Sequence, residues 1–301
     1  MRSRKPSPSP FPPGLALLLA VFAISWGSIL VRLCSAGPLV IACYRVGIAA
    51  AILAPFAVRK GALRRFSARV SIRVFLAGLL LAAHFGAWIW SLNLTSIGSS
   101  VLLVSSQPLF SAFLSGAILG ERAPARTYAG ISVSLAGMIL ISGGDLRLSP
   151  DRLTGDLLAV VAAVAGAGYF VIGRQLRAEL PFVTYLFAIY GAAAALLGIA
   201  AWNADQPLTG LRPADYAWLS VMAVVPSIIG HGGLNWAVRH VRVFLVSLAA
   251  FGEPILATFY AWLLFREPVP PALISGAALI FAGILISLPR PARTSFQGSP
   301  P

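Results

Sequence analysis

Glu253 lies inside a long apolar segment, FGEPILATFYAWLLFREP at residues 251–268, and no charged residue separates it from Arg242 or Arg266. A charged side chain at the centre of a membrane helix costs about 2.5–3.5 kcal/mol on insertion scales, so such residues usually serve a function. Burial disfavours the ionised carboxyl group, which would let Glu253 carry a proton. If it stays ionised, it can pair with the ammonium group of a substrate. Glu253 is therefore the first candidate for substrate binding, with both roles open.

Two histidines lie in other apolar segments and have similar surroundings. His84 and Trp88 are four residues apart, and His231 and Asn235 repeat that spacing. Residues four apart share one face of a helix. An imidazole can donate or accept a hydrogen bond and titrates near neutral pH, so all four residues are candidates for substrate contact. A structural role, in which each histidine bonds a neighbouring helix, is the alternative.

Three further side chains within apolar segments could contact a substrate or support the site. Trp26 and Tyr169 would each offer a flat amphipathic surface, or they would serve only as packing and interface anchors. Arg45 is the remaining charged group well inside an apolar segment. Its long side chain could reach toward the membrane surface or pair with Glu253, and the sequence leaves both open.

Two prolines are expected to kink the helices that carry the polar groups. Pro108 directly follows Gln107, and Pro254 directly follows Glu253. Proline lacks a backbone N–H and clashes with the carbonyl four residues earlier, so each should bend its helix and free that carbonyl. The carbonyls concerned are those of Val104 and Ala250. Polar backbone at membrane depth is tolerated where it lines a cavity.

The composition indicates which solvent surrounds these elements. The chain has 301 residues, of which 58% are hydrophobic and only 11% charged, and its mean hydropathy is +0.85. Ordinary soluble domains carry about 25% charged residues, so the surrounding solvent is lipid. The net charge of +14 comes from short clusters between apolar segments and is better explained by membrane orientation than by nucleic-acid binding. Cys34 and Cys43 are too few for a metal site and form either one bridge or two free thiols.

Apolar segments long enough to cross a membrane recur along the chain. A spanning helix needs about 20 residues, and these segments lack the alternation of a membrane β-strand. We therefore predict an all-α integral membrane protein with ten transmembrane helices, at residues 14–34, 38–58, 72–94, 97–119, 127–143, 154–173, 182–202, 214–238, 243–265 and 270–288. We predict that residues 1–13 are a Pro/Ser-rich, disordered cytoplasmic N-terminus before an uncleaved first helix, and that residues 289–301 are a cytoplasmic tail.

The distribution of Lys and Arg predicts the orientation of these helices. Most of the positive residues fall in the segments that lie on the same side as the N-terminus. Cytoplasmic loops carry the excess of Lys and Arg, so both the N-terminus and the C-terminus are predicted to be cytoplasmic. The expected location is the cytoplasmic, or inner, membrane.

The two halves of the chain resemble each other. SSQPLFSAFLSGAILGERAPARTYAGISVSLAGMIL, at residues 105–140, aligns with residues 251–286 at a constant offset. Pro108 falls on Pro254, and Gln107 falls on Glu253, so the repeat is symmetric in fold but not in charge. Other matched pairs are Glu121 with Glu267, Gly130 with Gly276, Gly137 with Gly283 and, one position out of register, His84 with His231. We interpret residues 14–143 and 154–288 as duplicated five-helix repeats.

An odd number of helices per repeat turns the second repeat upside down relative to the first. Inverted repeats are a hallmark of secondary transporters, with the substrate site near the midplane between the repeats. The segments quoted above, with AAHFGAWIWSLNLTSIGSSVLLVSSQP and PSIIGHGGLNWAV, resemble the EamA family of the drug/metabolite transporter superfamily over residues 15–288. The resemblance implies transport of amino acids, other metabolites or drugs, with export as the expected direction.

These observations together predict a secondary active transporter that works by alternating access. It would export a small-molecule substrate across the lipid bilayer, with proton coupling through Glu253 and with contacts from Gln107, His84 and Asn235. No motif for a nucleotide, metal or other cofactor is present, so neither ATP hydrolysis nor enzymatic catalysis is expected. The alternatives are a membrane enzyme acting on a lipid-linked substrate and an assembly subunit. The sequence leaves open a homodimer.

Overall fold

All regular elements in the described part of the chain are helices. The computed structural model describes residues 12–58, 66–94, 100, 103–121, 123–142, 150–266 and 272–287. The first half of the chain contains α1 (Pro13–Ile24), α2 (Gly27–Leu33), α3 (Pro38–Val58), α4 (Ala68–Leu94), α6 (Gln107–Leu114), the π-helical turn η2 (Ser115–Leu119) and α7 (Ala125–Ser142). The second half contains α8 (Pro150–Glu179), α9 (Phe182–Asn203), α10 (Pro213–Met222), the π-helical segment η3 (Ala223–His231), α11 (Gly232–Ala237), α12 (Val243–Ala249), the 3₁₀ turn η4 (Ala250–Gly252), α13 (Glu253–Phe265) and α14 (Ala272–Ser287).

Seven helical segments among the described residues are long and apolar enough to cross a membrane. They are Pro13–Leu33, Pro38–Ala57, Ala68–Leu94, Leu153–Glu179, Phe182–Asn203, Pro213–Ala237 and Val243–Leu264. Each overlaps one of the predicted spans, although α8 extends six residues beyond the predicted end at residue 173. The other three predicted spans overlap α6–η2, α7 and α14, of which Gln107–Leu119 and Ile274–Ser287 are shorter apolar helices. Of the span predicted at residues 97–119, residues 97–99 and 101–102 lie outside the described part of the chain. The chain is thus a multi-pass membrane protein whose described part is helical.

Several of the long helices change geometry along their length. The α12–η4–α13 segment passes through a 3₁₀ turn directly before Glu253 and Pro254, and α6 begins at Gln107, next to Pro108. The Ala250 carbonyl is not free as predicted, because the tightened turn lets it accept the backbone N–H of Glu253. The proline therefore redirects the hydrogen bond rather than leaving the carbonyl open.

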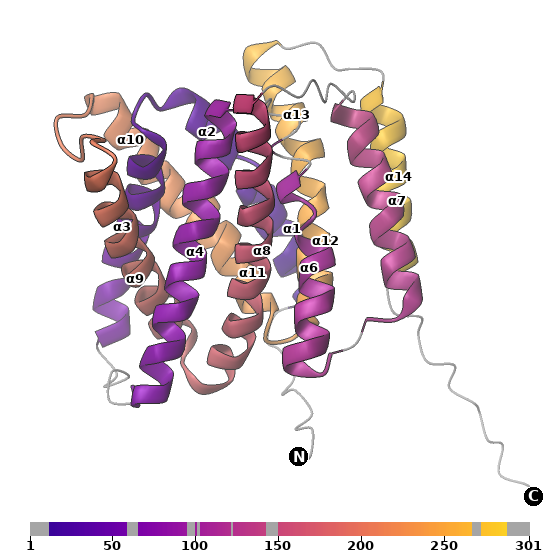
Figure 1. Cartoon of the computed structure of the whole chain (residues 1–301), viewed down its shortest axis with the longest axis horizontal. Coiled ribbons are helices and arrows are strands. Elements are labelled where there is room, and N and C mark those ends of the chain that lie inside the picture. Colours follow the sequence, from indigo (N-terminus) through magenta and orange to yellow (C-terminus); the bar gives the residue numbers. More distant parts are fainter. Residues whose placement is uncertain are drawn as a thin grey trace, which may run out of the picture.

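The helices pack in pairs that join the two halves of the chain. Helices α7 and α14 lie side by side at one edge of the bundle, and α3 packs on α9 (Figure 1). Helix α4 packs on α8, α1 packs on η3 and α11, and α6 packs on α12. These contacts interleave the halves, so the described part of the chain forms one bundle rather than two separate lobes.

Large apolar side chains cover much of the bundle surface. Leu18, Phe113, Trp202 and Ile274 are each at least 70% exposed. A soluble protein of this size would not expose so many large apolar residues in contiguous helices. In a bilayer this surface faces lipid, while the small and polar residues face the interior of the bundle.

Candidate functional site

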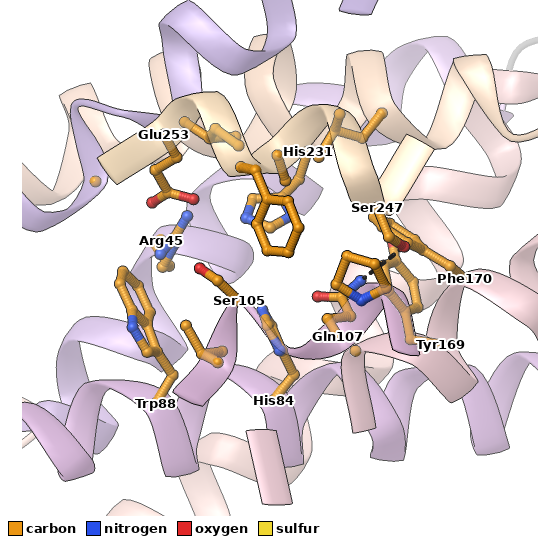
Figure 2. A pocket seen from close by; sticks show the side chains of 18 residues that line it. Arg45, His84, Trp88, Ser105, Gln107, Tyr169, Phe170, His231, Ser247 and Glu253 are labelled. Atoms are coloured by element: carbon orange, nitrogen blue, oxygen red, sulfur yellow. Dashed lines mark hydrogen bonds between the residues drawn. The ribbon is translucent and has the colours of Figure 1, made fainter. Parts of the chain in front are cut away.

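A cavity lies in the centre of the bundle, and both halves of the chain line it (Figure 2). The cavity volume is about 60 Å³, which is enough room for a small ligand or several ordered waters. The wall combines charged, amide, imidazole, hydroxyl and aromatic groups. The lining residues are Ile24, Gly27, Arg45, His84, Trp88, Val104, Ser105, Gln107, Pro108, Gly166, Tyr169, Phe170, His231, Leu234, Ser247, Ala250, Phe251 and Glu253.

Glu253 lies at the first position of α13, where the 3₁₀ turn gives way to the α-helix. Its side chain is partly buried and points into the cavity, toward Arg45 (Figure 2). An acidic residue is favoured in the first turn of a helix because the unpaired backbone N–H groups carry partial positive charge. The change from the 3₁₀ turn to the α-helix therefore places the carboxylate of Glu253 in the cavity wall, in the first turn of α13.

Arg45 is a second charged group in the cavity wall and is only 1% exposed. Its Nε donates a 3.1 Å hydrogen bond to Ser227 Oγ, and its guanidinium carbon lies 4.1 Å from the centre of the Phe85 ring. These contacts fix the inner part of the guanidinium group by hydrogen bonding and a cation–π interaction. Sequence reasoning left the role of Arg45 open, and the structure places it in the cavity wall with Glu253.

Pro226 explains how Ser227 comes to receive this hydrogen bond. Pro226 has no N–H for the carbonyl of Met222, four residues earlier, and the chain continues here as a π-helix, in which residues pair five apart; Ser227 Oγ also donates to the Met222 carbonyl at 2.9 Å. With its proton directed to Met222, the Ser227 oxygen is free to accept from Arg45. The Ser227 backbone carbonyl accepts a further hydrogen bond from the Tyr190 hydroxyl at 2.7 Å. The π-helical segment is thus fixed on both sides beside Arg45.

The two histidines that correspond in the repeat meet at the cavity. Their ring centres are 6.1 Å apart, and Phe85 lies 4.8 Å from His231 in an edge-to-face arrangement. His84 Nδ1 is 2.8 Å from the carbonyl oxygen of Ala162, so this nitrogen carries the proton that is donated. His231 Nδ1 is buried without a hydrogen-bond partner among the described residues. One histidine is therefore fixed by the protein, and the other offers an unused polar atom.

Gln107, Ser105 and Ser247 form a further polar part of the cavity wall. Gln107 Nε2 donates to Ser247 Oγ at 3.4 Å, and Ser247 Oγ lies 2.8 Å from Ser111 Oγ. These bonds connect α6 of the first half with α12 of the second half. Sequence reasoning missed Ser105 and Ser247, because a serine in an apolar helix carries no charge signal and occurs often without a function.

Two of the predicted substrate-binding residues do not line the cavity. Asn235 is fully buried, where its Oδ1 accepts from the Tyr185 hydroxyl at 2.7 Å and its Nδ2 donates to the His231 carbonyl at 2.7 Å. Trp26 stacks on Tyr260 instead, with ring centres 4.5 Å apart. The structure brings the other six together: Glu253, Gln107, His84, Trp88, His231 and Tyr169.

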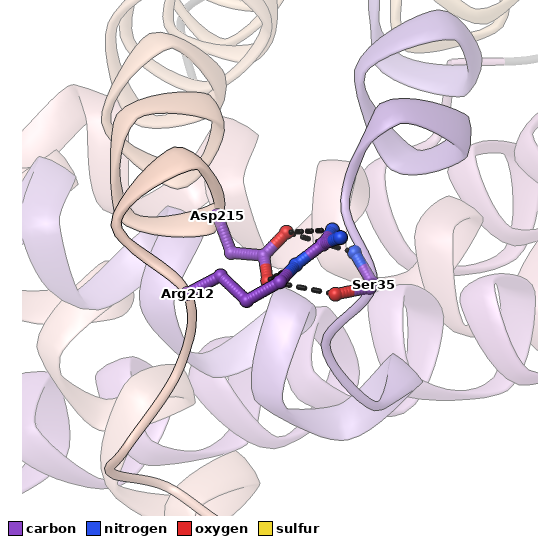
Figure 3. Close-up of polar contacts among 3 residues, drawn as sticks. All are labelled: Ser35, Arg212 and Asp215. Atoms are coloured by element: carbon purple, nitrogen blue, oxygen red, sulfur yellow. Dashed lines mark hydrogen bonds and ion pairs between the residues drawn. The ribbon is translucent and has the colours of Figure 1, made fainter.

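Polar contacts also connect the halves at the two ends of the bundle. At one end, both carboxylate oxygens of Asp215 accept hydrogen bonds from Arg212 and from Ser35 (Figure 3). At the other end, Arg174 pairs with Glu121 at 2.8 Å and also donates to the carbonyls of Val238 and Val241. Cys34 and Cys43, near the Asp215 end, are both free thiols.

Comparison with known proteins identifies relatives of this chain. Residues 13–143 and residues 153–288 each match the EamA-like transporter family. The chain is 27% identical over 191 residues to the uncharacterized transporter YdfC of Bacillus subtilis, covering 62% of this chain and 60% of YdfC. It is 25% identical over 195 residues to a probable terminal-alkyne amino-acid exporter of Streptantibioticus cattleyicolor, covering 63% of each.

Two further comparisons extend over more of the chain. The aromatic amino acid exporter YddG of Ancylobacter novellus is 26% identical over 215 residues, covering 70% of this chain and 73% of that protein. A solved crystal structure with 20% identity covers 91% of this chain and 96% of its own, with a TM-score of 0.75, which supports the fold. Because the family match accounts for both halves of the helical bundle, this chain belongs to the EamA-like transporter family.

Proposed function

We propose that the protein is a secondary active transporter that exports small metabolites, such as amino acids or drug-like compounds, across the cytoplasmic membrane. The observation that carries the proposal is the central cavity, in which Glu253 and Arg45 face aromatic and polar groups supplied by both halves. A site between two halves that move against each other can open alternately to each side of the membrane. Export as the direction follows the names of the two amino-acid exporters among the relatives.

Alternating access in this proposal uses two inverted five-helix repeats, and the packing of the helices supports that arrangement. The pairs α3–α9, α6–α12 and α7–α14 each join corresponding helices of the two proposed repeats. The contact of α4 with α8 has its counterpart in the contact of α1 with η3 and α11. A two-fold axis in the membrane plane would produce this set of pairs. The proposal counts ten spans, with α6–η2, α7 and α14 as the shorter ones.

Proton coupling is the second part of the proposal. Glu253 is the one acidic residue that lines the cavity in the described part of the chain. A carboxylate that holds either a proton or a cationic group of the substrate, but not both, couples the two movements in opposite directions. The proton gradient across the membrane would then drive export.

The test uses purified protein in liposomes loaded with L-phenylalanine, chosen because Trp88, Tyr169 and Phe170 line the cavity. An imposed proton gradient should accelerate phenylalanine efflux, and Glu253→Gln should abolish that acceleration while the protein still elutes as a folded species. Ser220→Ala, on the exposed face of α10, is the control and should retain full flux. A response to the gradient in Glu253→Gln equal to that of the wild type would exclude the coupling role.

A second test addresses alternating access without any ligand. Cys34 and Cys43 are replaced by serine, and Ser105→Cys places one thiol in the cavity wall. A membrane-impermeant thiol reagent should label this cysteine from either side of the membrane. Ser91→Cys is the control, because Ser91 is fully buried away from the cavity and should react from neither side. Labelling of Ser105→Cys from one side only, under all conditions, would contradict alternating access.

A further inference from the structure

The guanidinium group of Arg45 is held by the protein on one side, and one of its terminal nitrogens has no hydrogen-bond partner among the described residues. Ser227 and Phe85 hold the Nε side, whereas Nη1 is buried and has no hydrogen-bond partner among the described residues. A buried donor without a partner costs about 1–3 kcal/mol, and more when it carries a charge. Such a group in the wall of a cavity is suited to an anionic partner from the cavity itself, because guanidinium binds a carboxylate through two parallel hydrogen bonds.

Glu253 is the nearest source of negative charge in that wall. Both side chains line the cavity, and Figure 2 shows them pointing toward one another. With both groups ionised, the empty cavity carries one positive and one negative charge, so it has no net charge from this pair. In surroundings of low dielectric constant, a ligand that carries a net charge would leave the cavity charged, which costs binding free energy.

The other titratable groups that face Arg45 leave this balance unchanged when they are neutral. His84 uses its Nδ1 proton on the Ala162 carbonyl, and His231 packs edge-to-face on Phe85, the ring that Arg45 also contacts. Tyr190, from α9, donates its hydroxyl proton to the Ser227 carbonyl. The charge pattern presented to a ligand is therefore set by Arg45 and Glu253.

We propose that Arg45 binds the carboxylate of a zwitterionic substrate while Glu253 binds its ammonium group. This inference rests on the proposed function, because it assumes that the cavity is the substrate site. A zwitterion satisfies both charged residues and adds no net charge. A simple amine leaves Arg45 without an anion, and a simple carboxylate leaves Glu253 without a cation. The apolar part of the substrate lies against Trp88, Tyr169 and Phe170.

The experiment compares three probes that differ in one charged group. L-Phenylalanine carries both groups, phenethylamine lacks the carboxylate, and 3-phenylpropanoate lacks the ammonium. Binding to the purified full-length protein in detergent is measured by isothermal titration calorimetry at neutral pH. The wild type should bind phenylalanine at least tenfold more tightly than either of the other compounds. Arg45→Gln should bind phenylalanine no better than phenethylamine.

A second variant keeps the test decisive if Arg45→Gln does not fold. Ser227→Ala retains the Arg45 charge but removes the acceptor that holds Nε. It should weaken the binding of phenylalanine severalfold and leave phenethylamine binding within twofold of the wild type. Glu253→Gln, by contrast, should bind phenylalanine no more tightly than 3-phenylpropanoate.

Equal affinity of the wild type for phenylalanine and phenethylamine would overturn the inference. An undiminished preference for phenylalanine in Arg45→Gln, or in Ser227→Ala, would also overturn it, and so would binding of none of the three compounds. None of these results decides whether the protein works by alternating access, which is tested without a ligand by the two-sided labelling of Ser105→Cys. Failure of that labelling would contradict the transport proposal itself.

Discussion

The hydroxyl of Ser134 on α7 donates to the carbonyl of Ile280 on α14, and the two residues are 146 positions apart in the chain. The same offset relates the two similar segments of the sequence. Around this contact, Gly130 lies against Gly283, the counterpart of Gly137, and Gly137 lies against Gly276, the counterpart of Gly130. Each helix thus contacts its own counterpart in reverse order, as expected for antiparallel helices related by a two-fold axis between them.

Alanine at Gly130 should destabilise the pair formed by α7 and α14. A Cβ at this position would collide with the carbonyl oxygen of Gly283 and the hydroxyl of Ser287, so the backbones would have to separate. Overpacking of this kind costs about 1–3 kcal/mol. Gly130→Ala should therefore lower the melting temperature of the detergent-solubilised protein.

Gly191→Ala provides the matched control for this prediction. Gly191 lies in α9, and an added Cβ would meet no atom within 4 Å. Alanine is favoured over glycine inside helices by roughly 0.5–1 kcal/mol, so this variant should melt at the wild-type temperature or above it. If both variants melted alike, the close approach of α7 and α14 would not contribute to stability.

Much of the fold could be predicted from the sequence because the apolar segments are long and the repeat is regular. The seven long spans were located, and the counterparts His84 and His231 do meet at the cavity. Contacts that depend on the angle between helices could not be predicted in this way. Periodicity places Asn235 one turn from His231 but does not show that α9 brings Tyr185 to it. Local sequence likewise indicates that Arg45 is unusual but does not identify Ser227, 182 residues later, as its partner.

Asn235 should prove to be a structural residue, contrary to its interpretation from the sequence. Asn235→Leu removes the acceptor of the Tyr185 hydroxyl in a fully buried place, which should cost about 1–3 kcal/mol. The double variant Asn235→Leu with Tyr185→Phe should be more stable than the sum of the two single losses predicts. The reason is that the double variant leaves neither a buried hydroxyl nor a buried amide oxygen without the partner it had in this hydrogen bond. Thermal melting of the four proteins measures this coupling. Additive losses would show that the hydrogen bond contributes nothing.

The cluster around Asp215 should hold one end of the bundle closed. Ser35, between α2 and α3, donates both its backbone N–H and its hydroxyl to Asp215 at the start of α10. Asparagine at position 215 retains only one acceptor oxygen, so this connection between the halves is weakened. The distribution of Lys and Arg predicts that this end faces outward. Asp215→Asn should therefore increase labelling of Ser105→Cys from outside severalfold, measured by mass spectrometry. Ser220→Ala, on the same helix, should leave the labelling rate unchanged.

Arg174 should hold the opposite end closed. It joins Glu121, at the end of η2 in the first half, to the Val238 and Val241 carbonyls in the second half. Glu121→Gln removes the charge but keeps the shape, so it should speed labelling of Ser105→Cys from the inner side.

Glu179→Gln is the matched control, since its partner is Arg73 at the same end and its side chain is 44% exposed, against 18% for Glu121. An exposed pair contributes about 0.2–1 kcal/mol and is screened by solvent, so Glu179→Gln should change the rate less. Equal acceleration in both variants would mean that general loss of negative charge, rather than the Arg174 contact, controls the inner opening.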